Sequence, residues 1–491
     1  MKIENIVTIL LVGFILASCA PAVTVIPTET TVPTFTPAPS TSTVTQTPAP
    51  ENLTDTKDLS KWIDEFVHAY GGKITVNGAE MSASQLTDEI RKNAESFTQV
   101  KEIKGVEYSF LVVNGVPLAI STSKEQWRKV LGRDLTGALN MDFVMPILYS
   151  DISDPKNIEI LENVTKVTMT NDLAMNVAYG SLTTQDWKNI LADWDDIEKS
   201  MDEGKIPEGI PYNWQQADAV FEFTEEHNLK MRVQHLLDSG DAVPDSIYDG
   251  GFTKDELKII LEFTTSVTVL KYQGRVDEWD VEDEQVVADI NKQGNEKYGF
   301  WVREVGLVDA VEIVARIVDK LDPEASIIIA EDHILDKEFA REQPYLRDQF
   351  FIFLDELQKR GVPIDGVDLE NNVWIHNPPD IEYMKKILEE IKKRNLYISA
   401  GESNVLVVDE YPWYEPVKKT TTSTPEDVYA DITQAYIEVG ARGIGFGDVA
   451  DKWSFLNYSG LSDANPALFD DNAEAKPAYY EVLKVLYEHL P

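Results

Sequence analysis

The stretch Trp279-Asp280-Val281-Glu282-Asp283-Glu284 closes a short β-rich run on a carboxylate. A second run later in the chain, Ile398-Ser399-Ala400-Gly401-Glu402, also ends in glutamate. Because the chain holds 85 Asp plus Glu among 491 residues, any single glutamate is more often a solvated surface charge. Whether these two glutamates are functional therefore has to be judged from their positions in the repeating pattern of strands and helices.

Short β-rich runs alternate with longer helical patterns from about Asp142 onward. Most of the runs are rich in Val and Ile and are bounded by Gly, Pro, Asn or Asp, which is typical of β-strands. We predict strands at 143–148, 166–170, 230–236, 276–281, 326–330, 365–369, 396–400 and 443–446.

The segments between the predicted strands carry helix signals. Thr253 with Glu256 three residues later predicts a capping box that opens one helix. Thr424 as N-cap, followed by Pro425 at the first helical position, opens another. Apolar residues recur at helical spacing over 349–359, 383–393 and 428–439.

Eight strand–helix units over about 350 residues predict an α/β fold, a (β/α)8 barrel with some insertions. The alternative is an open, doubly wound sheet. We prefer the barrel because no Gly-rich phosphate loop follows the first strand and because the count closes at eight.

Polar residues follow most of the predicted strands, at the rim where a barrel of this kind carries its chemistry. They are Asn171, His235, Glu284, Asp332, Glu370 with Asn372, Glu402, and Asp448 with Asp451. Singly, each has an ordinary explanation: His235 as a buried, hydrogen-bonded histidine, for example, or Asp332 as a loop cap. Collected on one rim, they predict a functional site.

Two carboxylates at strand ends suit the cleavage of a glycosidic bond. One protonates the leaving oxygen, and the other attacks or stabilises the positive carbon of the sugar. This chemistry needs no metal or other cofactor, and the sequence offers no Cys/His cluster for a metal.

The N-terminus predicts export from the cytoplasm. Lys2 precedes an apolar run over 6–16, which has signal-peptide length and is too short to span a bilayer. The run ends in Leu16-Ala17-Ser18-Cys19, which resembles a bacterial lipobox and marks Cys19 as the site of lipidation. The alternative is a stray cysteine in an ordinary signal peptide. Cys19 is the only cysteine, so no intrachain disulfide is possible.

The composition divides the rest of the chain. After the signal peptide of residues 1–19, residues 20–52 are almost only Thr, Pro, Ser, Ala and Val, which predicts an extended, disordered tether. Residues 53–135 predict a small α+β region of unknown role, with helices at 59–69 and 83–95 and a hairpin around Asn114-Gly115. Residues 136–491 form the predicted barrel.

The formal net charge of −41 indicates the class of partner. It argues against nucleic acid and against anionic membrane surfaces, and it fits a neutral polysaccharide or oligosaccharide. We expect a monomer whose contact with the membrane is limited to the lipid at Cys19, on the extracytoplasmic side.

The region from about Asp142 to Pro491 resembles the glycoside hydrolase family 10 xylanases. The stretch ending in Glu284 looks like the family's W-D-V-V-N-E, whose final Glu is the general acid/base. Residues 396–404, which contain Glu402, align with the segment holding I-T-E-L-D, whose Glu is the nucleophile. Residues 212–235, 361–367, 468–470 and 476–480 also match the family in its order.

The resemblance implies a retaining endo-glycosidase that acts on β-1,4-xylan or a related plant polysaccharide. Glu402 would be the nucleophile and Glu284 the acid/base, with their carboxyls about 5–5.5 Å apart. The residues implied to line the sugar site are Asn171, His235, Asp283, Glu370 and Asn372.

The chain departs from the family pattern at its sugar-contacting positions. The lysine after strand two falls near Ala174, and the asparagine before the acid/base becomes Asp283. The Gln and His after strand six become Glu370 and Asn372. The tryptophan and histidine after strand three, and the tryptophans after strand eight, become Ser239, Gly240, Gly447 and Phe455.

An aromatic floor and neutral donors are thus exchanged for acids and small residues. Trp374, Trp413 and Trp453 are candidates for a rebuilt floor, with ordinary loop packing as the alternative. If the fourth strand stays regular, Asp280 and Glu282 face the same way as Glu284, and their charges favour its protonated form.

Two hypotheses from different classes follow. The first is a surface-anchored retaining endo-glycosidase. The second is a non-catalytic glycan-binding lipoprotein on a hydrolase barrel. Both glutamates are present, which favours the first, whereas the altered sugar-contacting positions keep the second open. A hydrolase with another sugar specificity is a third possibility.

Overall fold

The computed structural model describes residue 53 and residues 56–122, 126–237, 242–286, 297, 299–337, 345–407, 423–454, 456 and 464–491. Cys19 and the tether of residues 20–52 lie outside this set, as do Ser239, Gly240, Trp413 and Phe455. In the described part of the chain, no helix is both long enough and apolar enough to cross a bilayer.

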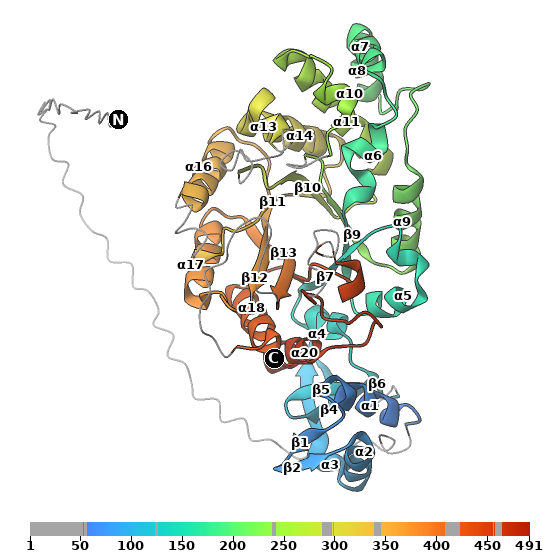
Figure 1. Ribbon diagram of the computed structural model, residues 1–491, viewed down its shortest axis with the longest axis vertical. Coiled ribbons are helices and arrows are strands. Elements are labelled where there is room, and N and C mark those ends of the chain that lie inside the picture. The colour runs from blue at the N-terminus through green and yellow to red at the C-terminus, as the bar shows by residue number, and fades with distance from the viewer. Residues whose placement is uncertain are drawn as a thin grey trace, which may run out of the picture. The chain divides into compact units, whose positions relative to one another are not determined.

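A closed ring of eight parallel strands forms the centre of the fold (Figure 1). Each strand pairs with the next along the chain, and the last pairs with the first. This confirms the predicted (β/α)8 barrel, and the open-sheet alternative is wrong. The strands are β7 (Asp142–Ile147), β8 (Lys166–Met169), β9 (Lys230–Gln234), β10 (Glu278–Asp283), β11 (Ser326–Glu331), β12 (Gly366–Trp374), β13 (Tyr397–Leu406) and β14 (Gly443–Gly445).

Helices surround the ring and begin at the predicted caps. Thr253 accepts a hydrogen bond from the backbone N–H of Glu256, and Thr424 accepts one from that of Asp427. The helices between and after the barrel strands are α5 (Pro155–Leu161), α6 (Met175–Tyr179), α7 (Thr184–Ala192), α8 (Trp194–Asp202), α9 (Gln215–Glu226), α10 (Asp245–Tyr248), α11 (Lys254–Tyr272), α13 (Phe300–Glu304), α14 (Leu307–Leu321), α16 (Tyr345–Lys359), α17 (Ile381–Lys392), α18 (Pro425–Val439) and α20 (Pro477–Glu488).

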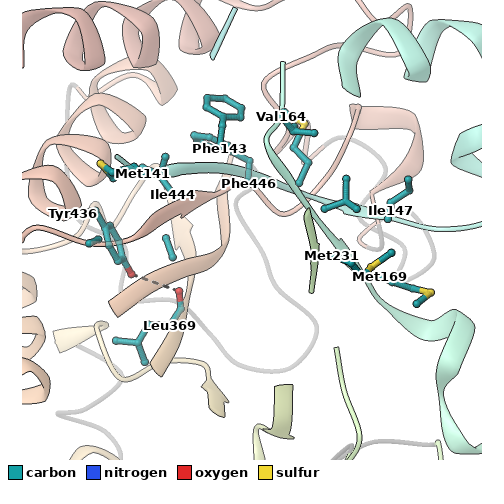
Figure 2. Close-up of a cluster of buried hydrophobic side chains, with 14 of the residues drawn as sticks. Met141, Phe143, Ile147, Val164, Met169, Met231, Leu369, Tyr436, Ile444 and Phe446 are labelled. Carbon is teal, nitrogen blue, oxygen red and sulfur yellow. Dashed lines mark hydrogen bonds between the residues drawn. The ribbon is translucent and has the colours of Figure 1, made fainter. Parts of the chain in front are cut away.

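Apolar side chains close the seam between the first and last strands. Phe143 of β7 and Phe446, just after β14, bring their ring centroids to 5.0 Å, and both residues are buried. Figure 2 shows them with Ile444, and also shows the Tyr436 hydroxyl donating to the Leu369 carbonyl at 3.5 Å. Strands buried on both faces read as continuous Val/Ile runs, which is why the sequence located them.

The region before the barrel contains a four-stranded antiparallel sheet, β3 (Thr98–Ile103), β4 (Val106–Val113), β5 (Val116–Thr122) and β6 (Arg128–Lys129). The predicted hairpin around Asn114-Gly115 joins β4 and β5. The other elements are α1 (Leu59–Ala69), β1 (Ile74–Val76), β2 (Ala79–Met81), α2 (Ala83–Lys92), α3 (Ala94–Phe97) and α4 (Gly132–Ala138).

Aromatic contacts join this region to the C-terminal helix α20. The rings of Phe66 and Tyr480 lie 5.0 Å apart, and those of Phe110 and Tyr487 lie 4.9 Å apart. The described residues from Leu53 to Pro491 accordingly belong to one compact unit. The domain boundary between residues 135 and 136 stays a prediction.

Buried ion pairs fill the barrel interior near the strand starts. Arg232 of β9 is 0% exposed; its guanidinium lies 2.8 Å from Glu278 of β10 and 2.5 Å from Asp368 of β12. A third contact joins Arg232 Nη2 to Ser399 Oγ of β13 at 2.9 Å. Lys166 of β8 also reaches Glu278 at 2.6 Å. Burial alone would raise the pKa of Glu278, but Arg232 and Lys166 lower it to about 2.

Arg232→Met should therefore destabilise the fold strongly. Glu278 keeps Lys166, but Asp368 loses its cation inside the barrel, and a broken buried pair costs about 3–5 kcal/mol. The measurement is the free energy of unfolding from urea denaturation. Arg91→Met, at an exposed position on α2, is the matched control and should change it by less than about 0.5 kcal/mol. Equal effects of the two changes would contradict a structural role for Arg232.

Candidate active site

The carboxyl ends of the strands bring acidic side chains together in two groups. Glu284 follows β10, Asp332 follows β11 and Glu370 belongs to β12, and one ligand atom of each lies within 4.8 Å of the others. His235, Asp280 and Asp283 form the second group at the same spacing. Within it, His235 Nδ1 lies 3.2 Å from Asp283 Oδ2. Of the rim residues predicted from the sequence, His235, Glu284, Asp332 and Glu370 thus lie in these two groups.

Glu284 leaves the strand in a left-handed turn. Its φ is +50°, a conformation that non-glycine residues seldom adopt, and strand β10 ends one residue earlier. The pairing of β10 with β11 also shifts register between Asp280 and Asp283. The expected alternation of Asp280, Glu282 and Glu284 on one side is therefore wrong. The turn instead directs Glu284 toward Asp332 and Glu370.

Strands β12 and β13 continue side by side to Trp374 and Leu406, and this places Glu370 beside Glu402. Their pairing shifts register between Leu369 and Glu370, after which Glu370 stands opposite Glu402 and Asn372 opposite Asn404. Side chains at opposed positions lie on the same face of neighbouring strands. The register shift thus brings an acid and two amides against the predicted nucleophile.

A chain of amide hydrogen bonds runs from Glu402 to the other acids. Asn404 Nδ2 donates to Glu402 Oε1 at 2.6 Å and to Asn372 Oδ1 at 2.9 Å. Asn372 Nδ2 lies 3.3 Å from Glu370 Oε2 and 3.4 Å from Asp332 Oδ2. Asn372 therefore does not contact Glu402 directly but acts on it through Asn404.

Gly447 leaves the space in which Asn404 sits. A Cβ atom at this position would lie 2.2 Å from Asn404 Nδ2, closer than any side chain tolerates. Any larger residue at position 447 would push the Asn404 amide away from Glu402. The small residue after strand eight is thus part of how Glu402 is held.

The charges around Glu402 oppose its ionisation. Burial raises the pKa of Glu402 most, followed by the charges of Asp448, Asp332, Asp283 and Glu284. The pKa of Glu370 is raised in the same way, first by burial and then by Glu402. Because Glu284 affects both carboxyls, the two predicted catalytic groups lie within electrostatic reach of each other.

Exposure separates Glu284 and Glu402 from the acids around them. Both are partly exposed. Asp283, Asp332 and Glu370 are only 7%, 6% and 8% exposed. The two predicted catalytic carboxyls are therefore the ones that a sugar can reach most readily, while Asp283, Asp332 and Glu370 are buried next to them.

Three other residues were predicted to contact the sugar: Asn171, Trp374 and Trp453. Asn171 lies exposed at the start of a 3₁₀ turn after β8, and its side chain makes no hydrogen bond with any other described residue. Trp374 ends β12 and is only 1% exposed, so it packs in the interior and cannot floor a sugar site. Trp453 is partly exposed, with Lys452 Nζ 5.0 Å from its ring centre, and it stays a candidate.

Sequence reasoning missed one buried acid of the rim, Glu331. This side chain is 0% exposed and accepts a hydrogen bond from the Val286 N–H at 3.0 Å. Burial, then the charges of Glu282 and Glu284, raises the pKa of Glu331. Its position directly after the Val/Ile run of β11 was the available signal, because every residue of such a strand is buried.

Comparison with known proteins identifies what this barrel is similar to. The family model of glycosyl hydrolase family 10 matches residues 159–485. Endo-1,4-beta-xylanase B of Thermotoga neapolitana is 26% identical over 289 residues, covering 58% of this chain and 77% of the relative. Endo-1,4-beta-xylanase A of Halalkalibacterium halodurans is 24% identical over 300 residues, covering 55% and 72%.

A solved structure shares the fold. Xylanase 10B from Thermotoga petrophila RKU-1, crystallised in complex with xylobiose, matches with a TM-score of 0.58 at 21% identity. The match covers 74% of this chain and 99% of that one. Nearly the whole fold of that chain thus has a counterpart here.

Proposed function

The chain belongs to glycosyl hydrolase family 10, and on that premise we propose that it is a retaining endo-glycosidase acting on β-1,4-xylan or a related plant polysaccharide. The observation that carries the proposal is the pair of partly exposed carboxyls, Glu284 and Glu402, in a rim of otherwise buried acids. Curated relatives named as xylanases support the substrate class.

In the proposed reaction, Glu402 attacks the anomeric carbon while Glu284 gives its proton to the departing glycosidic oxygen. The glycosyl-enzyme ester is then attacked by a water molecule that loses its proton to Glu284, and the sugar leaves with its configuration retained. Asn404 fixes Oε1 of Glu402, while no described group donates a hydrogen bond to Oε2. Oε2 is therefore the oxygen available for attack.

The hydrogen bond from Asn404 also opposes the rise in the pKa of Glu402 that its surroundings cause. The nucleophile must be ionised, yet burial and the neighbouring acids raise its pKa. An N–H donated to a carboxylate favours the ionised form. The short hydrogen bond from Asn404 thus lowers the pKa of Glu402, whereas the neighbouring acids raise it.

Alanine variants of the two glutamates test the assignment on an aryl β-xyloside and an aryl β-cellobioside. Glu402→Ala should lose activity by several orders of magnitude, because no other group replaces the attacking oxygen. Glu284→Ala should lose roughly 10²- to 10⁴-fold on poor leaving groups and less on good ones, which need no proton. Glu324→Ala, at an exposed position, is the matched control.

Added azide distinguishes the two roles. It should rescue Glu402→Ala with an α-glycosyl azide and Glu284→Ala with a β-glycosyl azide, because only the second reaction passes through the glycosyl-enzyme. The same product from both variants would contradict the assignment. If wild type and both variants are equally inert on a substrate panel but sugar still binds, the chain is a glycan-binding protein instead.

The pH profile of kcat/KM tests how Glu402 is tuned. Its acidic limb reports ionisation of the nucleophile in the free enzyme. Asp448→Asn removes a negative neighbour, which lowers the pKa of Glu402, so the limb should move to lower pH.

Asn404→Ala should move the same limb the other way. Loss of the N–H donor raises the pKa of Glu402 and should lower kcat roughly 10- to 100-fold, as for a lost hydrogen bond to a charged group. Shifts of the same sign in both variants would contradict this account of the nucleophile.

We propose further that the enzyme works on the extracytoplasmic side, tethered through residues 20–52 to a lipid on Cys19. Cys19→Ser should then release the protein from the membrane fraction, because one lipid-bearing residue supplies the anchor. The measurement is fractionation after labelling of cells with a radioactive fatty acid. Unchanged membrane association and labelling in the variant would contradict the anchor.

A further inference from the structure

Three consecutive backbone N–H groups hold the chain where it turns at the predicted acid/base. The N–H of Glu284 donates to a backbone carbonyl of β11 at 3.2 Å. The next N–H, of Gln285, donates to Glu282 Oε1 at 2.6 Å, and the third, of Val286, donates to Glu331 Oε2 at 3.0 Å. A strand carbonyl thus supplies the first acceptor of the turn, and two carboxyl groups supply the next two.

Backbone pairing does not hold the end of this turn. The pairing of β10 with β11 ends at Asp283, and the left-handed conformation of Glu284, with φ +50°, takes the chain away from the sheet. Gln285 and Val286 nevertheless stay buried, at 0% and 1% exposed, so water does not serve their N–H groups readily. A buried N–H without an acceptor is costly. The turn therefore needs acceptors from side chains.

Glu282 of β10 and Glu331 of β11 stand where an acid is otherwise unfavourable. Both side chains are 0% exposed. Each uses one oxygen for the turn, while the other, Oε2 of Glu282 and Oε1 of Glu331, is buried without a hydrogen bond in the described part of the chain. Burial of a carboxyl group is unfavourable unless hydrogen bonds compensate for it. The compensation here is the pair of bonds to the turn.

We propose that Glu282 and Glu331 are positioning residues that hold Glu284 in its left-handed turn on the rim. This inference rests on the proposed function, in which Glu284 is the acid/base. A proton donor must lie within hydrogen-bond reach of the departing oxygen, so a small shift of the turn slows the reaction. Val stands at position 282 in the family pattern W-D-V-V-N-E, so the anchor at Glu282 is a feature of this chain.

Glu331 gives the sharper test, because it belongs to another strand and its substitution leaves the sequence of β10 unchanged. Glu331→Leu keeps a side chain of similar size but removes the acceptor for the Val286 N–H. Glu331→Gln keeps an oxygen that can accept this hydrogen bond. The glutamine variant should therefore retain what the leucine variant loses.

Asp322→Leu is the matched control. Asp322 is only 4% exposed and accepts the Gly274 N–H at 3.0 Å, so it is also a buried acid that holds a backbone turn. Its second oxygen accepts a hydrogen bond from the indole of Trp279, near the start of β10 and away from the rim. Its loss should destabilise the fold without displacing Glu284.

The kinetic measurement is kcat/KM on two aryl β-xylobiosides, one with a dinitrophenyl and one with a phenyl leaving group. Glu331→Leu should lower the value for the phenyl glycoside by up to about 100-fold. It should lower the value for the dinitrophenyl glycoside much less, because that group departs without a proton. The ratio of the two values within one preparation does not depend on the folded fraction, so poor folding cannot produce this result.

A second measurement needs no turnover. Amide hydrogen exchange, followed by mass spectrometry of a peptide that contains residues 284–286, should be faster in Glu331→Leu than in wild type. Exchange of this peptide in Glu331→Gln and Asp322→Leu should stay close to that of wild type.

Two outcomes overturn the proposal. One is a ratio of the two kcat/KM values in Glu331→Leu equal to that of wild type or of Asp322→Leu. The other is unchanged hydrogen exchange in Glu331→Leu. A wild type that is inert on both glycosides would contradict the proposed function, whereas the exchange rates would still decide whether Glu331 holds the turn.

Discussion

Charge neutralisation inside the barrel is the constraint on which the rest of the structure depends. An eight-stranded barrel has room inside for side chains and little else, so its buried ions must be matched by other side chains. Near the strand starts they are matched: Arg232 joins four strands through Glu278, Asp368 and Ser399, and Lys166 supports it. At the opposite rim the described acids outnumber the bases, so protons or sugar hydroxyls must balance them.

The sequence predicted the elements of the fold and the place of the site, because both follow local rules. Val/Ile runs marked strands that are buried on both faces, and Thr253 and Thr424 marked helix starts through hydrogen bonds a few residues away. A chain of eight strand–helix units can form only a few topologies, chiefly a barrel or an open sheet. The ends of the strands follow from their positions, so the sequence predicts Glu284, Asp332, Glu370 and Glu402 on one rim.

What the sequence could not give depends on departures from regular geometry. The left-handed turn at Glu284 directs its side chain to another face, and no residue type nearby indicates it. The register shift between β12 and β13 leaves Gly401 without a partner, and a glycine inside a strand pattern indicates a bulge without fixing the new register. Regular alternation therefore failed for Asp280 and Glu282. The contact of Asn404 with Asn372 also depends on that register, since it places the two amides opposite each other.

The amide chain bears on whether the site is built for hydrolysis or is a remnant. Asn372, Asn404 and Gly447 fit only together: Asn404 bonds Asn372 and Glu402, and it has room because position 447 carries no Cβ. The two hydrogen bonds donated by Asn404 Nδ2 hold this amide in one orientation, although its own Oδ1 is buried without a hydrogen-bond partner among the described residues. A glycan-binding surface has no need to fix one oxygen of a carboxylate. A nucleophile does, and this favours the enzyme over the binding protein.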